Sequence, residues 1–387
     1  MVSLMLSVMT LAIVGFSEYL LYAHKSKAYN QPLMLLLLCL GLLACGPIVF
    51  QLLPDYRFVY IAALPLVFFA LLPSLWIYHL AITSQQPWQW SRAVKKHYRP
   101  LIAVTFLSAL IVSLPEQEFD QLFFSELKTE SLQTVIVSYS FFVALIVWCG
   151  MSTLYAFSIV KHSIRYRREL KNVFSDSSGK LLRWIDWLTF LLLFIWLYAL
   201  LVLVFEDRYQ NLMISENGVL LLLLVLVCFL AANGVSQKPG FADVYGAKIE
   251  NQRNPNPESE ENRDVQSKYH RSALDETQAQ RIANKLALAI QQQQVHLDPS
   301  LTLYKLAKHI GVPNQYLSQT LSQNLQTTFF DYINYARIET AKIMLLDSKD
   351  SVLSIAMAVG FNARSSFYKA FKQYTGVTPS DFRKQAL

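Results

Sequence analysis

Seven long stretches without Asp, Glu, Lys or Arg dominate the first 236 residues. They are residues 1–17, 28–54, 58–91, 100–115, 131–160, 187–205 and 217–237. Each consists mainly of Leu, Val, Ile, Phe and Ala, and a helix needs about 20 such residues to cross a bilayer. We therefore expect seven spanning helices near 2–23, 32–53, 58–82, 99–115, 132–160, 185–205 and 217–236. No basic segment precedes the first stretch, so a cleaved signal peptide is not expected.

Basic residues are concentrated in alternate loops between these expected spans. The loops after the first, third and fifth spans, with Arg183 just beyond, hold thirteen Lys and Arg, whereas the other loops hold three. The positive-inside rule places the basic loops in the cytoplasm. The N-terminus is then outside, and seven crossings leave the C-terminal half in the cytoplasm. Six crossings would instead put the C-terminal half outside the cytoplasm. The number of spans therefore decides whether this half can reach cytoplasmic partners.

Two acidic residues lie in or beside the expected spans. Glu18 is in the first span, and Asp186 begins the sixth. An ionisable group inside a membrane is costly and often functional, so both residues are candidates for sensing a signal. The alternative is an ion pair at the level of the lipid headgroups, because Lys25 and Arg183 are close in sequence. The sequence leaves both interpretations open.

The cysteine pattern gives no sign of a metal site. The four cysteines, which all lie in apolar stretches, are Cys39, Cys45, Cys149 and Cys228. Because no cluster of Cys and His has the spacing of a zinc site, we expect neither a metal nor a cofactor.

The composition changes after residue 236. Residues 237–272 contain Gly240, Pro255 and Pro257 and show no hydrophobic periodicity, so we expect a flexible cytoplasmic linker. A coil of this length spans roughly 30–35 Å, and any DNA would therefore have to approach the membrane. Residues 281–387 carry twelve basic and six acidic side chains. This excess predicts a polyanionic partner, either nucleic acid or lipid headgroups.

Residues 273–387 contain one helix-turn-helix pattern twice. In the first copy Ala307 lies four residues before Gly311, and Leu317 lies six residues after it. Close helix crossing requires the small residue, the tight turn requires glycine, and the second helix needs an apolar anchor. Ala356 and Gly360 repeat the spacing 49 residues later. We expect Thr302 and either Asp350 or Ser351 to cap the first helix of each copy.

A long amphipathic helix is expected between the two copies. Its apolar positions are Phe329, Tyr332, Ile333, Ala336, Ile338, Ala341 and Leu345. We interpret Arg337 and Glu339 as residues that brace this helix and do not contact DNA.

The C-terminal stretch resembles a known family. The residues that carry the resemblance are Ala336 to Lys342, Ile355 to Asn362, Phe367 to Lys372 and Gly376 to Arg383. On these residues, the region from about 280 to 387 is similar to the DNA-binding domain of AraC/XylS-type regulators. In layout, residues 1–236 resemble the seven-span membrane regions that are fused to such domains in some bacterial regulators.

The resemblance implies a seven-helix domain whose two recognition helices enter the major groove on one face of DNA, ~34 Å apart. The first recognition helix would present Gln315, Ser318 and Gln319 to base edges. The second would present Arg364, Ser365, Tyr368 and Lys369. Phosphates would be held by Lys372, Arg383 and Lys384. Residues 314–324, the expected first recognition helix, contain no Lys or Arg, so we predict that the second helix dominates the affinity.

The expected molecule is all-α, with a seven-span membrane domain and a helical domain that carries two helix-turn-helix motifs. We expect a transcription regulator of the bacterial inner membrane that binds promoter DNA and responds to a small-molecule or membrane signal. A homodimer and a contact with RNA polymerase are further expected partners. The alternative is a receptor or transporter with a subsidiary DNA-binding tail. No nucleotide-binding, metalloprotease, kinase or hydrolase motif is present, so an enzyme is not expected.

Overall fold

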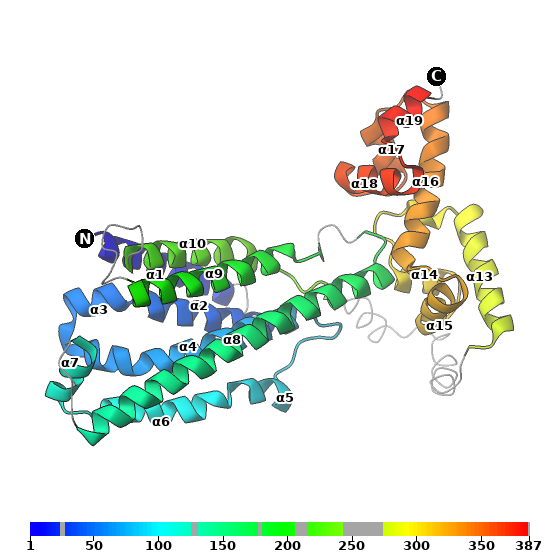
Figure 1. Cartoon of the computed structure of the whole chain (residues 1–387). Helices are drawn as coiled ribbons and strands as arrows, with labels where there is room; N and C mark the ends of the chain where they lie inside the picture. Colours follow the sequence, from blue (N-terminus) through cyan, green and yellow to red (C-terminus); the bar gives the residue numbers. More distant parts are fainter. Residues whose placement is uncertain (24–27, 125–130, 177–179, 206–215, 243–273, 386–387) are drawn as a thin grey trace. The chain divides into compact units, whose positions relative to one another are not determined.

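The computed structural model describes residues 1–23, 28–124, 131–176, 180–205, 216–242 and 274–385 (Figure 1). Within these ranges the chain forms helices and no β-strand, which confirms the all-α fold. The chain divides into two compact units. Unit 1 comprises Met1–Ser163 and Arg183–Ala242, and unit 2 comprises Ile164–Leu182 and Asp243–Leu387.

Unit 1 consists of long apolar helices and a few short ones. The helices are α1 (Val2–Ala23), α2 (Gln31–Ala44), α3 (Gly46–Leu52), α4 (Arg57–Thr83), α5 (Arg92–Lys95), α6 (Pro100–Val112), α7 (Glu116–Phe124), the first part of α8 (Leu132–Val173), α9 (Arg183–Phe205) and α10 (Glu216–Gly234). The last part of α8, from Ile164 onward, belongs to unit 2. Neighbouring helices contact one another in the order α9, α10, α1, α2, α4 and α6. Trp148 of α8 donates from Nε1 to the carbonyl oxygen of Phe68 in α4 at 3.0 Å. Its ring also lies 4.9 Å from that of Trp196 in α9, so α8 joins the two sides of the bundle.

Six helices in the described residues are long and apolar enough to cross a membrane. The expected fourth span differs from the other six. Its residues, 99–115, lie in the first arm and the break of a bent pair of helical segments, Arg92–Val112 and Glu116–Phe124, whose axes differ by 112°. Pro115 lies in this break, and proline lacks the N–H that would continue the helix. The number of candidate spans is therefore seven only if the bent pair counts as one.

The helices of unit 1 bury small polar residues together with apolar ones, and they also expose many large apolar residues. In α1 the buried residues are Ser7, Thr10, Val14, Ser17 and Leu21. Ser7 Oγ donates to the carbonyl oxygen of Ala44 in α2. Two other hydroxyls bond to their own helix: Thr10 Oγ1 donates to the carbonyl oxygen of Leu6 at 2.7 Å, and Ser17 Oγ donates to the carbonyl oxygen of Ile13 at 2.7 Å. Large apolar side chains point outward on several helices, and they include Phe16, Leu38, Phe106, Phe142, Leu154, Phe157 and Phe190. Helices that associate in lipid show this pattern, because lipid gives no reason to hide apolar side chains.

Helix α8 extends well beyond the expected fifth span. It has 42 residues, and residues 161–173, which the sequence analysis assigned to a loop, are helical. These thirteen residues add about 20 Å of helix. The extension is amphipathic. Tyr166 and Leu170 are buried at a spacing of four residues, whereas Arg165, Arg168 and Lys171 are exposed.

Unit 2 contains seven α-helices in residues 274–385. They are α13 (Glu276–Gln291), α14 (Leu303–His309), α15 (Asn314–Gln319), α16 (Phe329–Asp347), α17 (Val352–Ala358), α18 (Arg364–Thr375) and α19 (Pro379–Gln385). A short 3₁₀ turn, η5 (Val295–Leu297), precedes α14, and a π-helical turn, η6 (Thr320–Asn324), follows α15. Helix α16 runs from the group α13–α15 to the group α17–α19 (Figure 1).

Two apolar clusters divide these helices into lobes. The first lobe is built on residues from α13, α14, α15 and η6, with Phe329 and Ile333 from the start of α16. The second lobe is built on α17 and α18, with Ile338, Ala341 and Leu345 from the rest of α16. Each lobe therefore contains one helix-turn-helix, and both share α16 as a common support.

The start of the expected linker packs against unit 1. The N–H of Gly240 donates to the carbonyl oxygen of Ile82 at 2.9 Å, and Phe241 is buried. The rest of the expected linker, residues 243–272, lies outside the described residues.

Candidate DNA-binding surface

The two helix-turn-helix turns have the same backbone geometry. Gly311 and Gly360 have φ angles of 65° and 91°, which glycine adopts readily and other residues rarely adopt. In the first turn the N–H of Val312 donates to the carbonyl oxygen of Ala307 at 2.9 Å. In the second turn the N–H of Phe361 donates to the carbonyl oxygen of Ala356 at 3.0 Å. The repeated Ala and Gly therefore have the roles that the sequence predicts.

Side-chain caps begin the first helix of each motif. Thr302 Oγ1 accepts from the N–H of Lys305 at 3.2 Å, and Ser351 Oγ accepts from that of Ser354 at 3.1 Å. The expected cap at Thr302 is confirmed, and Ser351 caps α17. These caps satisfy backbone donors that the first turn of a helix leaves free.

The second recognition helix, α18, has one buried face and one polar face. Phe367, Ala370 and Phe371 anchor the buried face in the second lobe. The predicted DNA-contacting residues Arg364, Ser365, Tyr368, Lys369 and Lys372 recur at spacings of one, three and four residues, and so share the opposite face. Of these five, all but the half-buried Tyr368 are exposed.

Arg364 and Tyr368 interact with each other on this face. The guanidinium of Arg364 donates to the Tyr368 hydroxyl at 3.1 Å and lies over its ring, 4.9 Å from the centroid. Hydrogen bonds with Ser380 and with Arg364 lower the pKa of the Tyr368 phenol. The ring thus restrains the guanidinium, which can present paired N–H donors to an acceptor such as the edge of guanine.

The first recognition helix is shorter and carries no charge. Leu317 is fully buried in the first lobe, while Gln315 is exposed and Ser318 and Gln319 are half-buried. Gln319 Nε2 donates to Gln323 Oε1 at 2.9 Å, so the two glutamine amides form a pair along the helix. This helix offers neutral donors and acceptors only.

The predicted phosphate-binding residues differ in their surroundings. Lys372 and Lys384 are exposed. Arg383 is half-buried, and its Nε donates to the carbonyl oxygen of Leu345 at 3.1 Å, in the last turn of α16. Such a bond satisfies a carbonyl that the end of a helix leaves free. The structure therefore gives Arg383 a role in joining α19 to α16.

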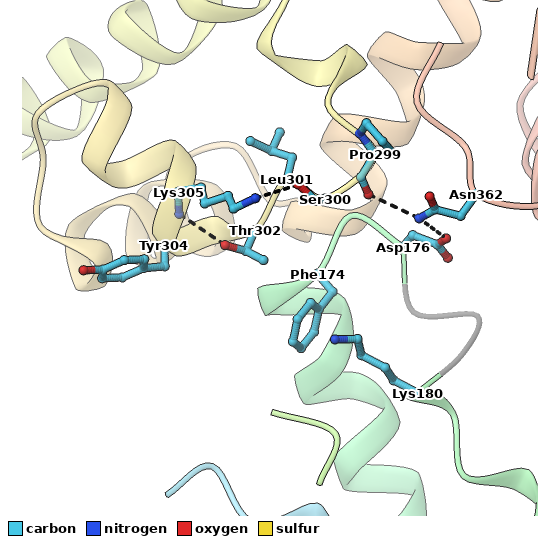
Figure 2. Close-up of a pocket in the computed structure, with 10 residues that line it drawn as sticks. All are labelled: Phe174, Asp176, Lys180, Pro299, Ser300, Leu301, Thr302, Tyr304, Lys305 and Asn362. Carbon is cyan, nitrogen blue, oxygen red and sulfur yellow. Dashed lines mark hydrogen bonds between the residues drawn. The ribbon is translucent and has the colours of Figure 1, made fainter. Parts of the chain in front are cut away.

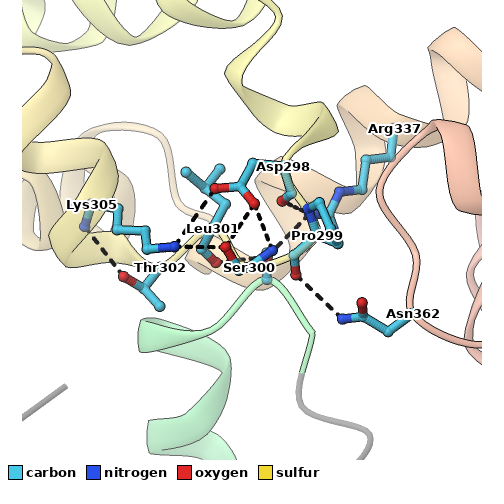
Figure 3. A network of polar contacts seen from close by, with 9 residues as sticks. Asp298, Pro299, Ser300, Leu301, Thr302, Lys305, Arg337 and Asn362 are labelled. Carbon is cyan, nitrogen blue, oxygen red and sulfur yellow. Dashed lines mark hydrogen bonds and ion pairs between the residues drawn. The ribbon is translucent and has the colours of Figure 1, made fainter. Parts of the chain in front are cut away.

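Arg337 braces the middle of α16, as the sequence predicts. It is fully buried, and its Nε donates to the carbonyl oxygen of His296 at 2.7 Å. Its Nη2 donates to the carbonyl oxygen of Asp298 at 2.8 Å (Figure 3). Burial lowers the pKa of Arg337 to about 10, although Asp176 and Asp298 oppose the shift, so the guanidinium stays charged at neutral pH. Glu339 instead pairs with Lys342, three residues along the helix, at 3.0 Å.

The candidate sensing residues lie in different helices of unit 1. Glu18 is in α1, and its Oε1 is buried without a hydrogen-bond partner in the described part of the chain. Asp186 is in the first turn of α9. Lys25, the suggested partner of Glu18, lies outside the described residues. No group of three or more His, Cys, Asp or Glu that could hold a metal occurs among the described residues.

Sequence reasoning did not identify one group of residues beside this surface. Ser175 is buried in unit 2, and Asp176 Oδ2 accepts from Asn362 Nδ2 at 2.9 Å, two residues before Arg364. Residues 174–176 have no apolar periodicity, and more than 100 residues separate them from the helices that they contact. No local signal in the sequence could have found this contact.

Comparison with known proteins agrees with this geometry. Residues 306–385 match the family model described as a helix-turn-helix domain. The melibiose operon regulatory protein of Escherichia coli (strain K12) is 33% identical over 87 residues, which are 22% of this chain and 29% of that protein. An uncharacterized HTH-type transcriptional regulator of Staphylococcus aureus (strain COL) is 31% identical over 90 residues, which are 23% of this chain and 12% of that protein.

A solved structure is also similar. The C-terminal domain of AraT, a response regulator from Geobacillus stearothermophilus, is 28% identical, with a TM-score of 0.25, and the match covers 30% of this chain and 88% of that chain. The chain spans less than a third of the length of the two curated relatives, and the match lies in its C-terminal region.

Proposed function

We propose that this chain, whose residues 306–385 form an AraC-type helix-turn-helix domain of a DNA-binding regulator, is a transcription regulator embedded in the bacterial inner membrane. Unit 1 would cross the membrane, and unit 2 would bind promoter DNA on the cytoplasmic side. Lipid, a second copy of the chain, RNA polymerase and a signal at the membrane domain complete the proposed set of partners.

The proposal of sequence-specific DNA binding rests on a single observation, the polar face of α18. It combines three exposed cations, Arg364, Lys369 and Lys372, with a hydroxyl at Ser365, while its other face is anchored in the second lobe. Lysines of this kind neutralise phosphates without regard to sequence, whereas a restrained guanidinium distinguishes bases.

The many large apolar side chains on the outside of unit 1 support membrane embedding. Ser7, Thr10 and Ser17 are buried with their hydroxyls bonded inside the bundle, and large apolar residues face outward on α1, α2, α6, α8 and α9. A water-soluble protein rarely exposes so many contiguous apolar side chains.

Replacing Arg364 by alanine is expected to weaken binding more than replacing Gln319 does. Arg364→Ala should cost about 1–3 kcal/mol and relax the preference at one base position, because it removes the charged donors of the dominant helix. The measurement is fluorescence anisotropy of the full chain in nanodiscs, with duplexes that the wild-type chain selects from a random library.

Lys349→Ala is the control, because this lysine lies between α16 and α17 and belongs to neither recognition helix. It should leave the affinity within a factor of two. A larger loss for Gln319→Ala than for Arg364→Ala would show that the first helix dominates.

Neutralising the candidate sensing residues tests the proposed role of unit 1. If Glu18 and Asp186 detect a signal, then Glu18→Gln and Asp186→Asn should change the response of a reporter gene while the protein level in the membrane stays the same. If both variants respond as the wild type does, these carboxylates do not sense the signal, and the alternative of ion pairs at the level of the lipid headgroups is favoured.

A further inference from the structure

Three residues at the end of α8 are built into the DNA-binding unit. They are Phe174, Ser175 and Asp176, which we name the docking segment. Ser175 is only 1% exposed. Its Oγ donates to the carbonyl oxygen of Leu301 at 2.7 Å and accepts from Arg337 Nη2 at 3.2 Å. Its carbonyl oxygen accepts from Asn334 Nδ2 at 3.3 Å, so both polar groups of Ser175 are held.

The flanking residues extend this contact. Phe174 forms an isolated antiparallel bridge with Thr302, the residue that caps α14. Asp176 Oδ2 accepts from Asn362, whose Nδ2 also donates to the carbonyl oxygen of Pro299 at 3.3 Å (Figure 2). Beside these residues lies a cavity of about 390 Å³.

The docking segment contacts both lobes and their common support. Thr302 begins the first helix-turn-helix, Asn362 lies in the turn of the second, and Asn334 and Arg337 are on α16 between them. Ser175 shares the Arg337 guanidinium with the carbonyl oxygens of His296 in η5 and of Asp298, so the docking segment is bonded to the side chain at the point where the two lobes meet.

Docking also places a carboxylate beside the second recognition helix. Asp176 engages the side-chain amide of Asn362, two residues before Arg364, the first residue of α18. A recognition helix approaches DNA through its N-terminal residues, where phosphates are close. A carboxylate there repels phosphate and occupies a donor that phosphate could use.

We propose that the docking segment is an intramolecular inhibitor of DNA binding, and that its release raises the affinity of unit 2 for duplex DNA. The inference rests on the proposed function. Helix α8 is one unbroken helix from Leu132 to Val173, so a displacement of its first part is passed to the segment that follows it. The docked and released states differ in the contacts of Ser175 and Asp176, and this difference lets a signal shift their populations.

A disulfide between the docking segment and the second turn tests the contact. Asp176→Cys and Asn362→Cys are combined in the full chain in membranes, with a protease site inserted in the linker between residues 251 and 262. After oxidation and cleavage, the double variant should stay joined on a non-reducing gel and separate on reduction. Each single variant should separate in both conditions, which controls for the four native cysteines. If the double variant separates as the single variants do, the docked contact does not form.

The same double variant, uncleaved in nanodiscs, tests inhibition. The oxidised form should bind a duplex at least about fivefold more weakly than the reduced form, the lower range of allosteric coupling. The two forms have one sequence, so the loss of Asn362 cannot produce the difference. Equal affinities, or tighter binding by the oxidised form, would overturn inhibition by the docked position of the segment. Both forms lack the Asp176 carboxylate, so Asp176→Asn in the full chain tests the charge, and an affinity no higher than that of the wild type would contradict its role.

A serine substitution tests release without a cross-link. Ser175→Ala removes the hydroxyl bonds to the carbonyl oxygen of Leu301 and to Arg337 with little change in volume, although the backbone N–H bond to Leu301 stays. It should raise the affinity of the full chain. An affinity at or below that of the wild type contradicts the inference. If the unmodified chain binds no duplex, the proposed function fails, while the cross-link still decides whether the segment docks.

Discussion

Replacing Gly360 by alanine is expected to destabilise the second lobe by about 2–5 kcal/mol. The φ angle of 91° costs an L-residue about 1–2 kcal/mol. A Cβ there would also lie 2.6 Å from the carbonyl oxygen of Leu297 and 3.1 Å from Arg337 Nε, and such overpacking costs about 1–3 kcal/mol. Hydrogen exchange of the full chain in nanodiscs measures the effect as lost protection of amides in α17 and α18.

Two glycines provide matched controls. Gly311 and Gly376 also have positive φ, at 65° and 81°, but a Cβ at either position meets no atom within 4 Å. Alanine there should cost only the backbone term, about 1–2 kcal/mol. If all three substitutions reduce protection equally, the close packing of the second turn against η5 has no energetic consequence.

Arg337→Ala is expected to cost about 3–5 kcal/mol. The substitution removes a buried cation and leaves the carbonyl oxygens of His296 and Asp298 without this donor. It also leaves a cavity at the point where the two lobes meet. Protection from hydrogen exchange should fall in both lobes, and DNA binding should fall with it.

Lys342→Ala is the control on the same helix. Lys342 pairs with Glu339 at 3.0 Å, but both side chains are substantially exposed, so its loss should cost less than about 1 kcal/mol. If Arg337→Ala is as mild as Lys342→Ala, the guanidinium does not hold the lobes together.

The sequence predicts the DNA-binding unit well because its constraints are local. Positive φ at Gly311 and Gly360, the small residues Ala307 and Ala356, and the cap at Thr302 each depend on neighbours within a few residues. Because the spacing of Ala and Gly occurs twice, it identifies the helix-turn-helix motifs more specifically than one copy would. The polar face of α18 follows directly from helical periodicity.

Features that depend on distant contacts could not be predicted. Arg383 is predicted to contact phosphate, which stays a prediction, and the sequence gives no sign that its Nε bonds to a carbonyl oxygen 38 residues earlier in the chain. The bend after α6 and the helical extension of α8 have local signals, Pro115 and an amphipathic pattern, but a search for long apolar stretches does not detect either of them. Ser175 lies in a short polar stretch like any surface loop, and only tertiary structure shows that it is buried.

Duplex binding to oriented membrane vesicles tests the central claim most directly. Inside-out and right-side-out vesicles are prepared from bacteria that express the full chain, and a fluorescent duplex is added at low salt, where binding does not depend on the base sequence. We expect the duplex to bind inside-out vesicles, to bind them more weakly after Arg364→Ala, and not to bind right-side-out vesicles. Binding only to right-side-out vesicles, binding to neither, or recovery of the chain in the soluble fraction would contradict it.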